Sequence, residues 1–303
     1  MSYLRLKNIL FKSPILVASG TYGYGNEVSD LVNVNNLGGI VTKSVTRYPR
    51  EGNPPPRIAE TSSGMLNSIG LANLGVDEYC SKVIPSLNKL ETNIIINIAG
   101  TAIEDYVETM QILESYDSKH IGYEINISCP NVKEGGMSFG VSSTMTEKLT
   151  KALRKETKKI LIMKLSPNVT SIEDIAVASQ NGGADAISAI NTVVGMGIDI
   201  KTKRSKLHTV LGGLSGPAIK PIALANIYKI YKVVDIPIIG LGGISCANDI
   251  IEFILAGADL VQIGTLNYRD PNIGVRLVSE VNDYCKNNNI NNLQDIKGQV
   301  IID

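Results

Sequence analysis

One segment combines an apolar run with several groups that could do chemistry. Tyr123–Ile127 has the composition of a buried strand, and a serine, a cysteine, a proline and an asparagine follow it at positions 128 to 131. Free cysteines are usually small buried hydrophobic residues, but Cys129 stands outside the apolar run. A thiolate can act as a base, and nearby lysines favour it over the thiol. We therefore predict that Cys129 transfers a proton and faces a flat, polar substrate.

The other cysteines and the histidines do not suggest a second reactive centre. Cys80, Cys246 and Cys285 lie in helical contexts, and we assign them to packing. Because no two cysteines have CxxC spacing, a local zinc or iron–sulfur cradle is excluded, and the pattern fits a reducing cytoplasm. His120 and His208 look incidental, so a Ser/His/Asp triad has no support.

Two lysines end apolar runs, where a solvated lysine is unusual. Lys43 follows one such run, and Lys164 stands between Met163 and Leu165. A cation in this position must find an anionic partner. It could stabilise negative charge on a reduced cofactor ring or a substrate carboxylate, or it could form a Schiff base. Both uses stay open at this point.

Asparagines offer paired donors and acceptors without charge, which suits a planar ring with carbonyl and N–H edges. Any one of them could instead be a turn former. The candidates for one shared face are Asn67, Asn97, Asn126, Asn131 and Asn191.

These groups can act together only in a fold that brings the ends of several strands close to one another. The chain contains a repeated strand–helix unit that can form such a fold. Near-continuous apolar strands alternating with helices indicate a parallel sheet covered on its outer face. Eight such units in this length predict a closed (β/α)₈ barrel, with a small antiparallel flap formed by the alternating Leu4, Leu6 and Ile9. The predicted strands are Ile15–Ser19, Gly39–Lys43, Ile94–Ile98, Tyr123–Ile127, Leu161–Leu165, Ala186–Ile190, Pro237–Leu241 and Asp259–Ile263.

Amphipathic helices between the strands support the count. A doubly wound open sheet would need a glycine-rich fingerprint after the first strand, which Gly20–Gly23 does not supply. Helices over Ile103–Leu113 and Ser171–Gln180 begin with capping-box spacing, and the second stops at Gly182 or Gly183. The boxes pair Thr101 with Glu104 and Thr170 with Glu173, and the last helix opens with Asp270 as N-cap and Pro271 at its first position.

A barrel's active site gathers residues from the carboxyl ends of its strands. Two glycine turns, Gly242–Gly243 and Gly264–Thr265, follow the last two strands, where barrels commonly hold a phosphate, although tight packing alone could explain each. Gly212–Gly216 allows another close backbone approach. The strand ends in order are Ser19–Gly20, Lys43–Ser44, Asn97, Asn126 with Cys129, Lys164, Asn191–Thr192, Gly242–Gly243 and Gly264–Thr265. The long segments 46–88 and 192–216 are expected to wall or cover this face.

Composition restricts the class of protein. The formal net charge is zero, with 29 basic and 29 acidic residues, which argues against a nucleic-acid-binding surface. The amino terminus lacks the layout of a signal peptide, and no apolar run approaches the ~20 residues that span a bilayer. We expect residues 1–303 to form one domain in the cytoplasm, without a membrane partner.

As a set, four motifs resemble the class 1 dihydroorotate dehydrogenases, in particular the 1B catalytic subunit. They are Asn126–Val132, Thr192–Met196, Gly212–Pro217 and Gly240–Ile244. The resemblance implies an FMN-containing (β/α)₈ barrel that oxidises dihydroorotate to orotate in pyrimidine synthesis. It also implies that Cys129 takes the C5 proton of the substrate while the C6 hydride passes to the flavin.

The resemblance assigns further roles residue by residue. Lys43 would touch flavin and substrate, and Lys164 would balance charge on the reduced ring. The residues implied to hold orotate are Lys43, Asn67, Ser68, Ile69, Gly70, Leu71, Asn126, Asn131, Asn191 and Thr192. Those implied to line FMN are Ser19, Gly20, Lys43, Ser44, Asn97, Asn126, Lys164, Ile190, Gly216, Gly242, Gly243, Gly264 and Thr265.

The resemblance also concerns partners. A cysteine base disfavours the quinone-linked class 2, and Cys129–Gly136 is similar to 1B rather than to the fumarate-linked 1A. A 1B enzyme passes electrons to NAD through a separate subunit carrying FAD and a 2Fe–2S cluster, which implies a homodimer flanked by two such subunits. The alternatives are a 1A enzyme, a related FMN-dependent pyrimidine reductase, an aldolase with a Schiff base on Lys164, and a barrel that only binds a phosphorylated ligand.

Overall fold

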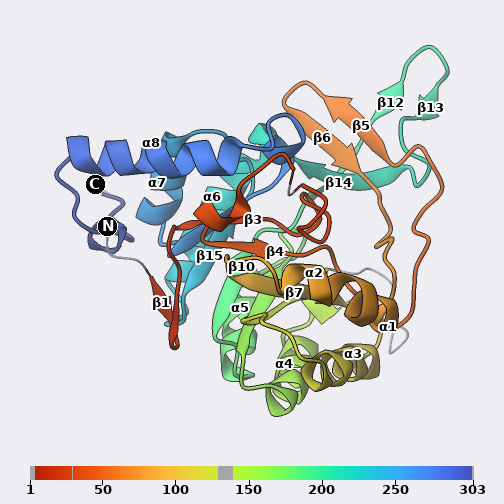
Figure 1. Ribbon diagram of the computed structural model, residues 1–303. Helices are drawn as coiled ribbons and strands as arrows, with labels where there is room; N and C mark the ends of the chain where they lie inside the picture. Colours follow the sequence, from red (N-terminus) through yellow and green to blue (C-terminus); the bar gives the residue numbers. More distant parts are fainter. Residues whose placement is uncertain (1–3, 29, 129–138, 302–303) are drawn as a thin grey trace.

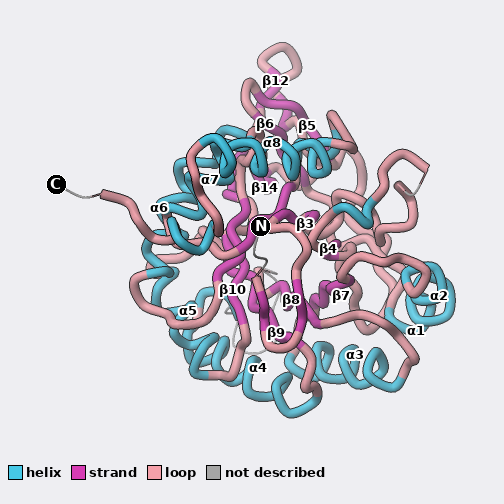
Figure 2. Tube along the Cα trace, turned by 60° about the vertical axis from the view of Figure 1, so that its left-hand side comes forward, coloured by secondary structure: helices cyan, strands magenta, loops and turns pink. Residues whose placement is uncertain are grey.

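Eight parallel strands close into a barrel in the computed structural model, which describes residues 4–28, 30–128 and 139–301. The barrel order is β10-β15-β16-β3-β4-β7-β8-β9, and Figures 1 and 2 show the barrel in two views. The strands are β3 (Ile15–Val17), β4 (Gly39–Val41), β7 (Ile94–Ala99), β8 (Gly122–Asn126), β9 (Ile160–Leu165), β10 (Ala186–Ala189), β15 (Ile238–Leu241) and β16 (Leu260–Ile263). All eight predicted strands and the (β/α)₈ class are confirmed.

The amino-terminal end of the barrel is filled with apolar side chains. Inward-facing residues such as Leu16, Ile95 and Ile162 form a buried cluster with Leu6 and Phe11 of the amino-terminal segment. That segment is the antiparallel hairpin β1 (Arg5–Leu6) and β2 (Ile9–Leu10), which confirms the predicted flap. Because this apolar cluster closes one end, polar groups inside the barrel lie toward the carboxyl ends of the strands.

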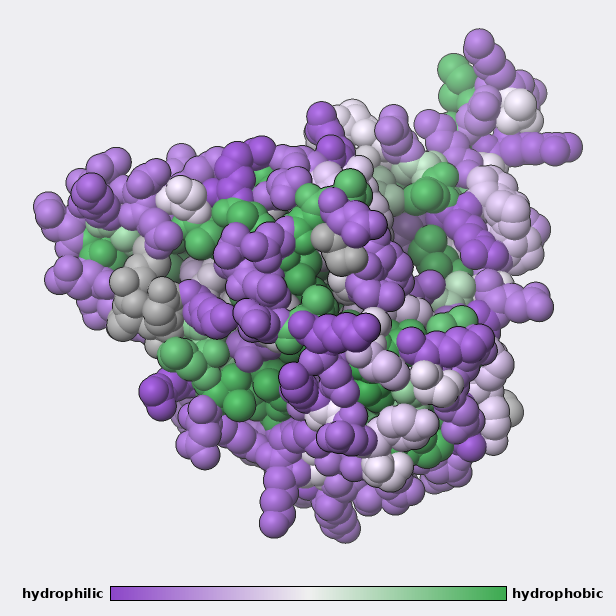
Figure 3. Space-filling model, viewed as in Figure 1, coloured by the Kyte–Doolittle hydropathy of each residue, from purple (hydrophilic) through white to green (hydrophobic). Residues whose placement is uncertain are grey.

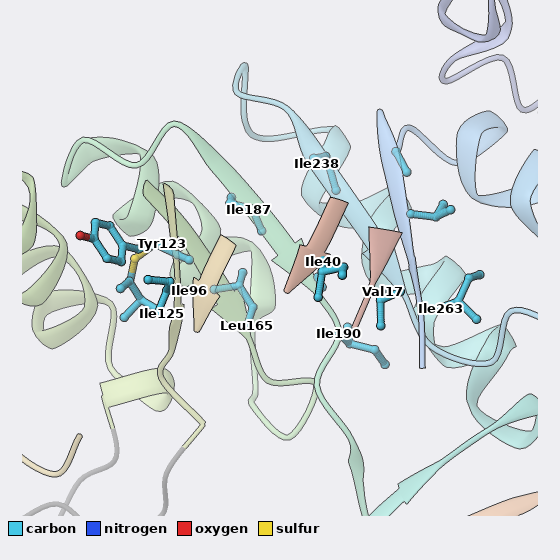
Figure 4. Close-up of a cluster of buried hydrophobic side chains, with 14 of the residues drawn as sticks. Val17, Ile40, Ile96, Tyr123, Ile125, Leu165, Ile187, Ile190, Ile238 and Ile263 are labelled. Carbon is cyan, nitrogen blue, oxygen red and sulfur yellow. The ribbon is translucent and has the colours of Figure 1, made fainter. Parts of the chain in front are cut away.

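Helices surround the strands, as Figure 2 shows, and cover their outward faces. Outward-facing side chains of the strands pack in a large buried cluster, part of which Figure 4 shows. The α-helices are α1 (Val76–Glu78), α2 (Ile84–Leu87), α3 (Ile103–Ser115), α4 (Ser143–Glu156), α5 (Ile172–Asn181), α6 (Lys220–Tyr231), α7 (Ala247–Leu255) and α8 (Ile273–Asn287). A π-helix spans Tyr79–Val83, and 3₁₀ turns span Val34–Asn36, Phe139–Val141, Pro217–Ile219, Thr265–Tyr268 and Leu293–Ile296. Within the described ranges, no helix is long and apolar enough to cross a bilayer.

The capping pair predicted for α3 is wrong by one residue, although the helix itself begins at Ile103 as predicted. The carboxylate of Asp105, rather than that of Glu104, accepts hydrogen bonds from the backbone N–H groups of Thr101 (2.9 Å) and Ala102 (3.1 Å). Ala102 is the N-cap residue of α3. Both acidic residues have a suitable spacing to a capping position, and the direction in which the chain enters the helix decides between them.

Two other helix starts also differ from the prediction. The N-cap of α5 is Ser171, whose hydroxyl accepts from the N–H of Asp174 (3.2 Å), so the box predicted at Thr170 is displaced by one residue. Asp270 is not the N-cap of α8, because that role falls to Asn272. The Asp270 carboxylate instead accepts from the N–H of Asn272 (3.0 Å) and fixes a turn that precedes the helix.

One cysteine assignment needs correction. Cys80 and Cys285 are buried, as expected for packing residues, and burial raises the pKa of the Cys80 thiol to about 11. Cys246 is exposed at the N-cap of α7, so it does not pack in the core. A residue at this position precedes the amphipathic stripe of the helix, and its side chain is therefore free to face solvent.

The two long segments join in a second, four-stranded antiparallel sheet beside the carboxyl ends of the barrel strands. Its order is β11-β14-β6-β5, and a small hairpin projects from it (Figure 1). The strands are β5 (Ile58–Thr61), β6 (Gly64–Asn67), β11 (Val193–Met196) and β14 (Leu211–Ser215), and the hairpin comprises β12 (Ile198–Asp199) and β13 (Arg204–Ser205). Segments that leave barrel strands β4 and β10 thus form one wall of the mouth.

Candidate active site

A buried polar layer lies above the apolar end of the barrel, and its centre is Glu124 on β8. Glu124 has no exposed surface, and its Oε1 lies 3.2 Å from Nζ of Lys164. The same oxygen accepts from Asn97 Nδ2 (2.8 Å), and Oε2 accepts from Gln262 Nε2 (2.7 Å). Three donors from three strands therefore hold one carboxylate at the barrel axis.

Lys164 is where the sequence placed it, at the carboxyl end of β9, and it is 6% exposed. Glu124 is its only acceptor within the described part of the chain. An ammonium has three donors, so two N–H groups remain for a ligand in the mouth. Beside it on β10 the buried Ser188 Oγ has no described partner, and neither does Gln262 Oε1.

Lys43 is half-buried and lies after β4. Its Nζ lies 5.9 Å from the ring centroid of Tyr24, whose hydroxyl accepts a hydrogen bond from the backbone N–H of Leu74 (3.3 Å). None of the described acidic residues forms an ion pair with Lys43. The two lysines thus differ, since Lys164 is paired inside the barrel and Lys43 rests against an aromatic ring.

Asn67, Asn126 and Asn191 form a row with Thr192 across the mouth, whereas Asn97, which was predicted to share this face, lies deeper in the buried polar layer. Asn191 Nδ2 lies 3.3 Å from Asn126 Oδ1, and Asn191 Oδ1 accepts from the N–H of Thr192 (2.7 Å). The Thr192 hydroxyl packs against Gly213, where a Cβ atom would lie 2.1 Å from it. Asn67 in turn donates to the Gly213 carbonyl (3.3 Å). Elements from three parts of the chain therefore bring Asn126, Asn191, Thr192 and Asn67 together.

The loop after Asn67 is fixed mainly by Asn53. The N–H of Asn53 donates to the Ile69 carbonyl (3.1 Å), and its amide donates to the Ser68 carbonyl (3.0 Å). Gly70 has a φ of +75°, and a Cβ atom there would lie 2.6 Å from the Asn53 nitrogen. Leu71 also has a positive φ, of 57°. The loop Ser68–Leu71 is therefore a defined, half-buried structure that continues from the amide row.

The two glycine turns that follow the last two strands lie close to Gly216. A Cβ atom at Gly243 would lie 2.9 Å from the Gly216 carbonyl, and one at Gly216 would lie 3.6 Å from Cγ2 of Thr265. The N–H groups of Gly216 and Gly243 donate to no described residue. These residues form a compact backbone cradle of the kind that binds phosphate. Gly242 packs beside Ile190, and a Cβ atom at Gly264 would contact Ala18 (3.7 Å) alone among the described residues.

The remaining predicted cofactor contacts lie on neighbouring strand ends. Ser19 donates to the Thr42 carbonyl (2.9 Å), and Gly20, with a φ of +82°, has open space where a Cβ would be. Ser44 donates to Asn97 Oδ1 (2.5 Å), which links this edge of the mouth to the buried polar layer. Asn97 itself is fully buried and contacts the mouth through Ser44.

Two predicted residues, Cys129 and Asn131, lie outside the described residues. The strand that leads to them is well defined at its end. The Asn126 carbonyl accepts from the Tyr106 hydroxyl (2.8 Å), and Asn126 Oδ1 accepts from the N–H of Ser128 (3.2 Å).

Sequence reasoning missed Glu124 and Gln262, although a signal was present. Gln262 is a single polar residue inside an otherwise apolar strand, which is the same signal that identified Lys164, and Glu124 stands between the apolar Tyr123 and Ile125 in a strand that also carries Asn126. It also missed Asn168, whose amide donates to the Thr192 carbonyl (2.9 Å) and accepts from the N–H of Val194 (2.9 Å). Asn168 thereby fastens β11 to the end of β9.

Comparisons with known proteins agree with this arrangement. A family model described as dihydroorotate dehydrogenase matches residues 2–284. The chain is 48% identical over 295 residues to the "Dihydroorotate dehydrogenase B (NAD(+)), catalytic subunit" of Bacteroides thetaiotaomicron, covering 97% of each chain. The identically named subunit of Phocaeicola vulgatus is 49% identical over 287 residues (94% of each chain), and that of Alkaliphilus metalliredigens 48% over 297 residues (98% of each).

A solved structure supports the fold. The crystal structure of the DHODH of Eimeria tenella in complex with ferulenol superposes with a TM-score of 0.83 at 23% identity, covering 98% of this chain and 88% of that one. At this identity the likeness concerns the fold alone. Together with the full-length matches above, the findings confirm the resemblance seen in the sequence, and this chain belongs to the dihydroorotate dehydrogenase family.

Proposed function

We propose that this chain is the catalytic subunit of an FMN-dependent dihydroorotate dehydrogenase, oxidising dihydroorotate to orotate in de novo pyrimidine biosynthesis. The observation that carries the proposal is the row of uncharged amides from Asn126 to Asn67, beside the ion-paired Lys164. A planar ring with alternating carbonyl and N–H groups needs such neutral donors and acceptors. The names of the full-length relatives support the same reaction. In this proposal residues 1–303 act as one FMN-binding barrel.

The residues present fit FMN. The cradle at Gly216 and Gly243 offers backbone N–H groups for a phosphate, and open space lies beside Gly20. Deeper in the mouth, Lys164 has spare N–H donors for ring carbonyls. Bound FMN would accept the hydride from C6 of the substrate. The set proposed to line it is Ser19, Gly20, Lys43, Ser44, Asn97, Asn126, Lys164, Ile190, Gly216, Gly242, Gly243, Gly264 and Thr265.

The chain's own residues would bind the substrate and move its proton. Asn67, Asn126, Asn131, Asn191 and Thr192 would hold the ring and its carboxylate, with the loop Ser68–Leu71 beside them. Lys43, which has no described carboxylate partner, is available to a substrate anion. Cys129 would act as the base and remove the C5 proton. It would do so as the thiolate, which is the form of cysteine that can accept a proton.

The ion pair of Lys164 weighs against the aldolase alternative. A Schiff base would form at Nζ of Lys164, which lies 3.2 Å from the buried carboxylate of Glu124, and would disrupt that ion pair. The role that fits this lysine is a fixed positive charge near the reacting ring.

We further propose that the electrons pass to NAD through a partner subunit that carries FAD and a 2Fe–2S cluster, in the cytoplasm. The relatives' names, which include NAD(+) and the word subunit, support this. We expect a homodimer flanked by two partner subunits. An apolar surface for association is present on the second sheet and its hairpin, where Val194, Met196, Ile198 and Ile200 are 57%, 50%, 54% and 87% exposed. Figure 3 shows apolar side chains on this projecting hairpin among hydrophilic ones.

The test is to purify the chain and release its cofactor by denaturation. FMN should be released in about equimolar amount, and dihydroorotate should bleach the bound flavin without oxygen. NAD should not be reduced until an iron–sulfur flavoprotein subunit is added. A colourless protein that takes up no added FMN would refute the proposal, and NAD reduction by this chain alone would refute the partner.

A further inference from the structure

We propose that Glu124 is a positioning residue for Lys164, and that its charge limits how strongly this lysine stabilises the reduced flavin. The inference deepens the proposed function and rests on it. It concerns a fully buried carboxylate that the reaction itself does not use.

Strand register places Glu124 directly beneath the end of Lys164. Glu124 pairs with Ile162 on β9, and Asn126 pairs with Lys164, so the carboxylate belongs one layer deeper than the lysine. Ile162 is part of the apolar cluster that fills the barrel below. The ammonium is thus fixed from the closed side of the barrel, and its remaining donors are left for the open side.

The carboxylate is itself immobilised. Oε1 accepts from Asn97 Nδ2 (2.8 Å), and Oε2 accepts from Gln262 Nε2 (2.7 Å). Asn97 is fixed in turn by the Ser44 hydroxyl, at 2.5 Å. Donors on β7, β9 and β16 therefore hold Glu124, and a side chain held from three strands keeps one rotamer.

Only one of the three donors carries a charge. Asn97 and Gln262 orient the carboxylate without neutralising it, so Lys164 and Glu124 form one buried ion pair of zero net charge. In an interior of low dielectric constant, each member acts strongly on a ring bound at the mouth. A lone cation at this place would favour the anionic reduced ring, and the carboxylate offsets part of that effect.

The test measures the two-electron reduction potential of bound FMN in Glu124→Gln, in the purified protein equilibrated with a reference dye. Removing the negative charge should favour the reduced flavin, raising the ratio of reduced to oxidised form at a fixed dye potential by about tenfold, or ~30 mV for two electrons. The glutamine introduced at position 124 can still form hydrogen bonds with its buried polar neighbours. Gln262 Oε1 has no described partner, so rotating that amide lets it accept from the introduced N–H group.

A matched control separates this effect from general loss of a buried ion pair. Asp259 is 5% exposed and binds Lys297 Nζ through both carboxylate oxygens at 2.7 Å, at the amino-terminal end of β16. Asp259→Asn should lower stability and leave the flavin potential unchanged. A potential in Glu124→Gln equal to that of the parent protein, with FMN bound, would overturn the proposal.

A second comparison tests whether Glu124 acts through Lys164. In a Lys164→Met background, adding Glu124→Gln should change the flavin potential by less than it does in the parent protein, because the carboxylate then acts on the ring only through its own field and no longer through the position of the lysine. An undiminished tenfold effect would show that Glu124 acts independently, and would overturn its positioning role.

Urea unfolding of the FMN-free chain gives a readout that does not depend on the proposed function. Lys164→Met leaves a buried carboxylate without its cation, so it should lower the unfolding midpoint more than the double variant Lys164→Met/Glu124→Gln does. Additive midpoints would refute the pairing even if FMN never binds. Coupled midpoints in a chain that takes up no flavin would instead refute the proposed function and keep the pair.

Discussion

The ring of Tyr24 supports the ammonium of Lys43, whose Nζ lies 5.9 Å from the ring centroid. The same tyrosine contacts a different element through its hydroxyl, which accepts from the N–H of Leu74 (3.3 Å). Its ring also packs edge-on against Tyr79, with centroids 5.2 Å apart. One side chain thus links a candidate catalytic lysine to the segment that follows the substrate loop.

These two contacts of Tyr24 can be separated by substitution. Tyr24→Phe keeps the ring beneath Lys43 and removes the acceptor for Leu74, so we expect KM for dihydroorotate to rise about threefold with little change in kcat. Tyr24→Leu removes both contacts and should also lower kcat by about fivefold, because a cation above an aromatic ring gains about 1 kcal/mol. Steady-state kinetics with a dye acceptor would measure both. Equal kcat values for the two variants would contradict a role of the ring.

The amide row makes a prediction about substrate affinity. Asn191→Ala removes the group that contacts Asn126 Oδ1 (3.3 Å) and the Thr192 N–H (2.7 Å), so orotate should bind about tenfold or more weakly. Spectral titration of the bound flavin with orotate would measure this. Asn226→Ala is the control, because among the described residues that amide bonds only the exposed Ile222 carbonyl (2.8 Å). Equal orotate affinity in both variants would remove Asn191 from the site.

The proposed thiol base predicts a change in pH dependence. A serine hydroxyl is a much weaker acid than a thiol, so Cys129→Ser should retain slow turnover that increases toward higher pH. Cys129→Ala should slow bleaching of the flavin by dihydroorotate by at least 10²-fold at every pH. Stopped-flow reduction between pH 6 and 10 would compare them. Cys246→Ala, which changes an exposed thiol at the start of α7, should behave as the parent protein.

His120 predicts how folding stability depends on acid. Burial lowers the pKa of this histidine to about 4, and its Nε2 has no described partner, while Nδ1 lies 2.9 Å from the Ser118 hydroxyl. The unfolded chain binds a proton near pH 6.5 and the folded chain does so only near pH 4. Stability should therefore fall as the pH drops through this window, by at most about 3 kcal/mol.

The measurement is urea unfolding at pH 7 and pH 5, above the range in which Glu114, whose pKa is lowered, takes up its proton. His120→Phe keeps an aromatic ring against Tyr123, 4.8 Å away between centroids, and should remove most of the dependence. His208→Phe changes an exposed histidine and should leave it intact. A pH dependence that survives His120→Phe would assign it to other groups.

The barrel and most of the polar residues at its mouth could be predicted from the amino-acid sequence. The apolar strands, each followed by a polar or glycine residue, indicate parallel strands whose ends converge, and Lys164 stood out because it interrupts an apolar run. Helix starts were less predictable. At α3 the neighbouring Glu104 and Asp105 both had plausible spacing, and only the path of the backbone chose the aspartate.

The contacts between these groups could not be predicted from the sequence and follow from how the chain folds. Glu124 and Gln262 are 138 residues apart, and closure of the barrel brings their side chains to 2.7 Å. Likewise, Asn67 meets Gly213 because two long segments share one sheet. Such contacts follow from barrel closure and register rather than from local periodicity. The fold therefore determines which charged group lies beside Lys164. That neighbour is what distinguishes an ion-paired lysine from one that could form a Schiff base.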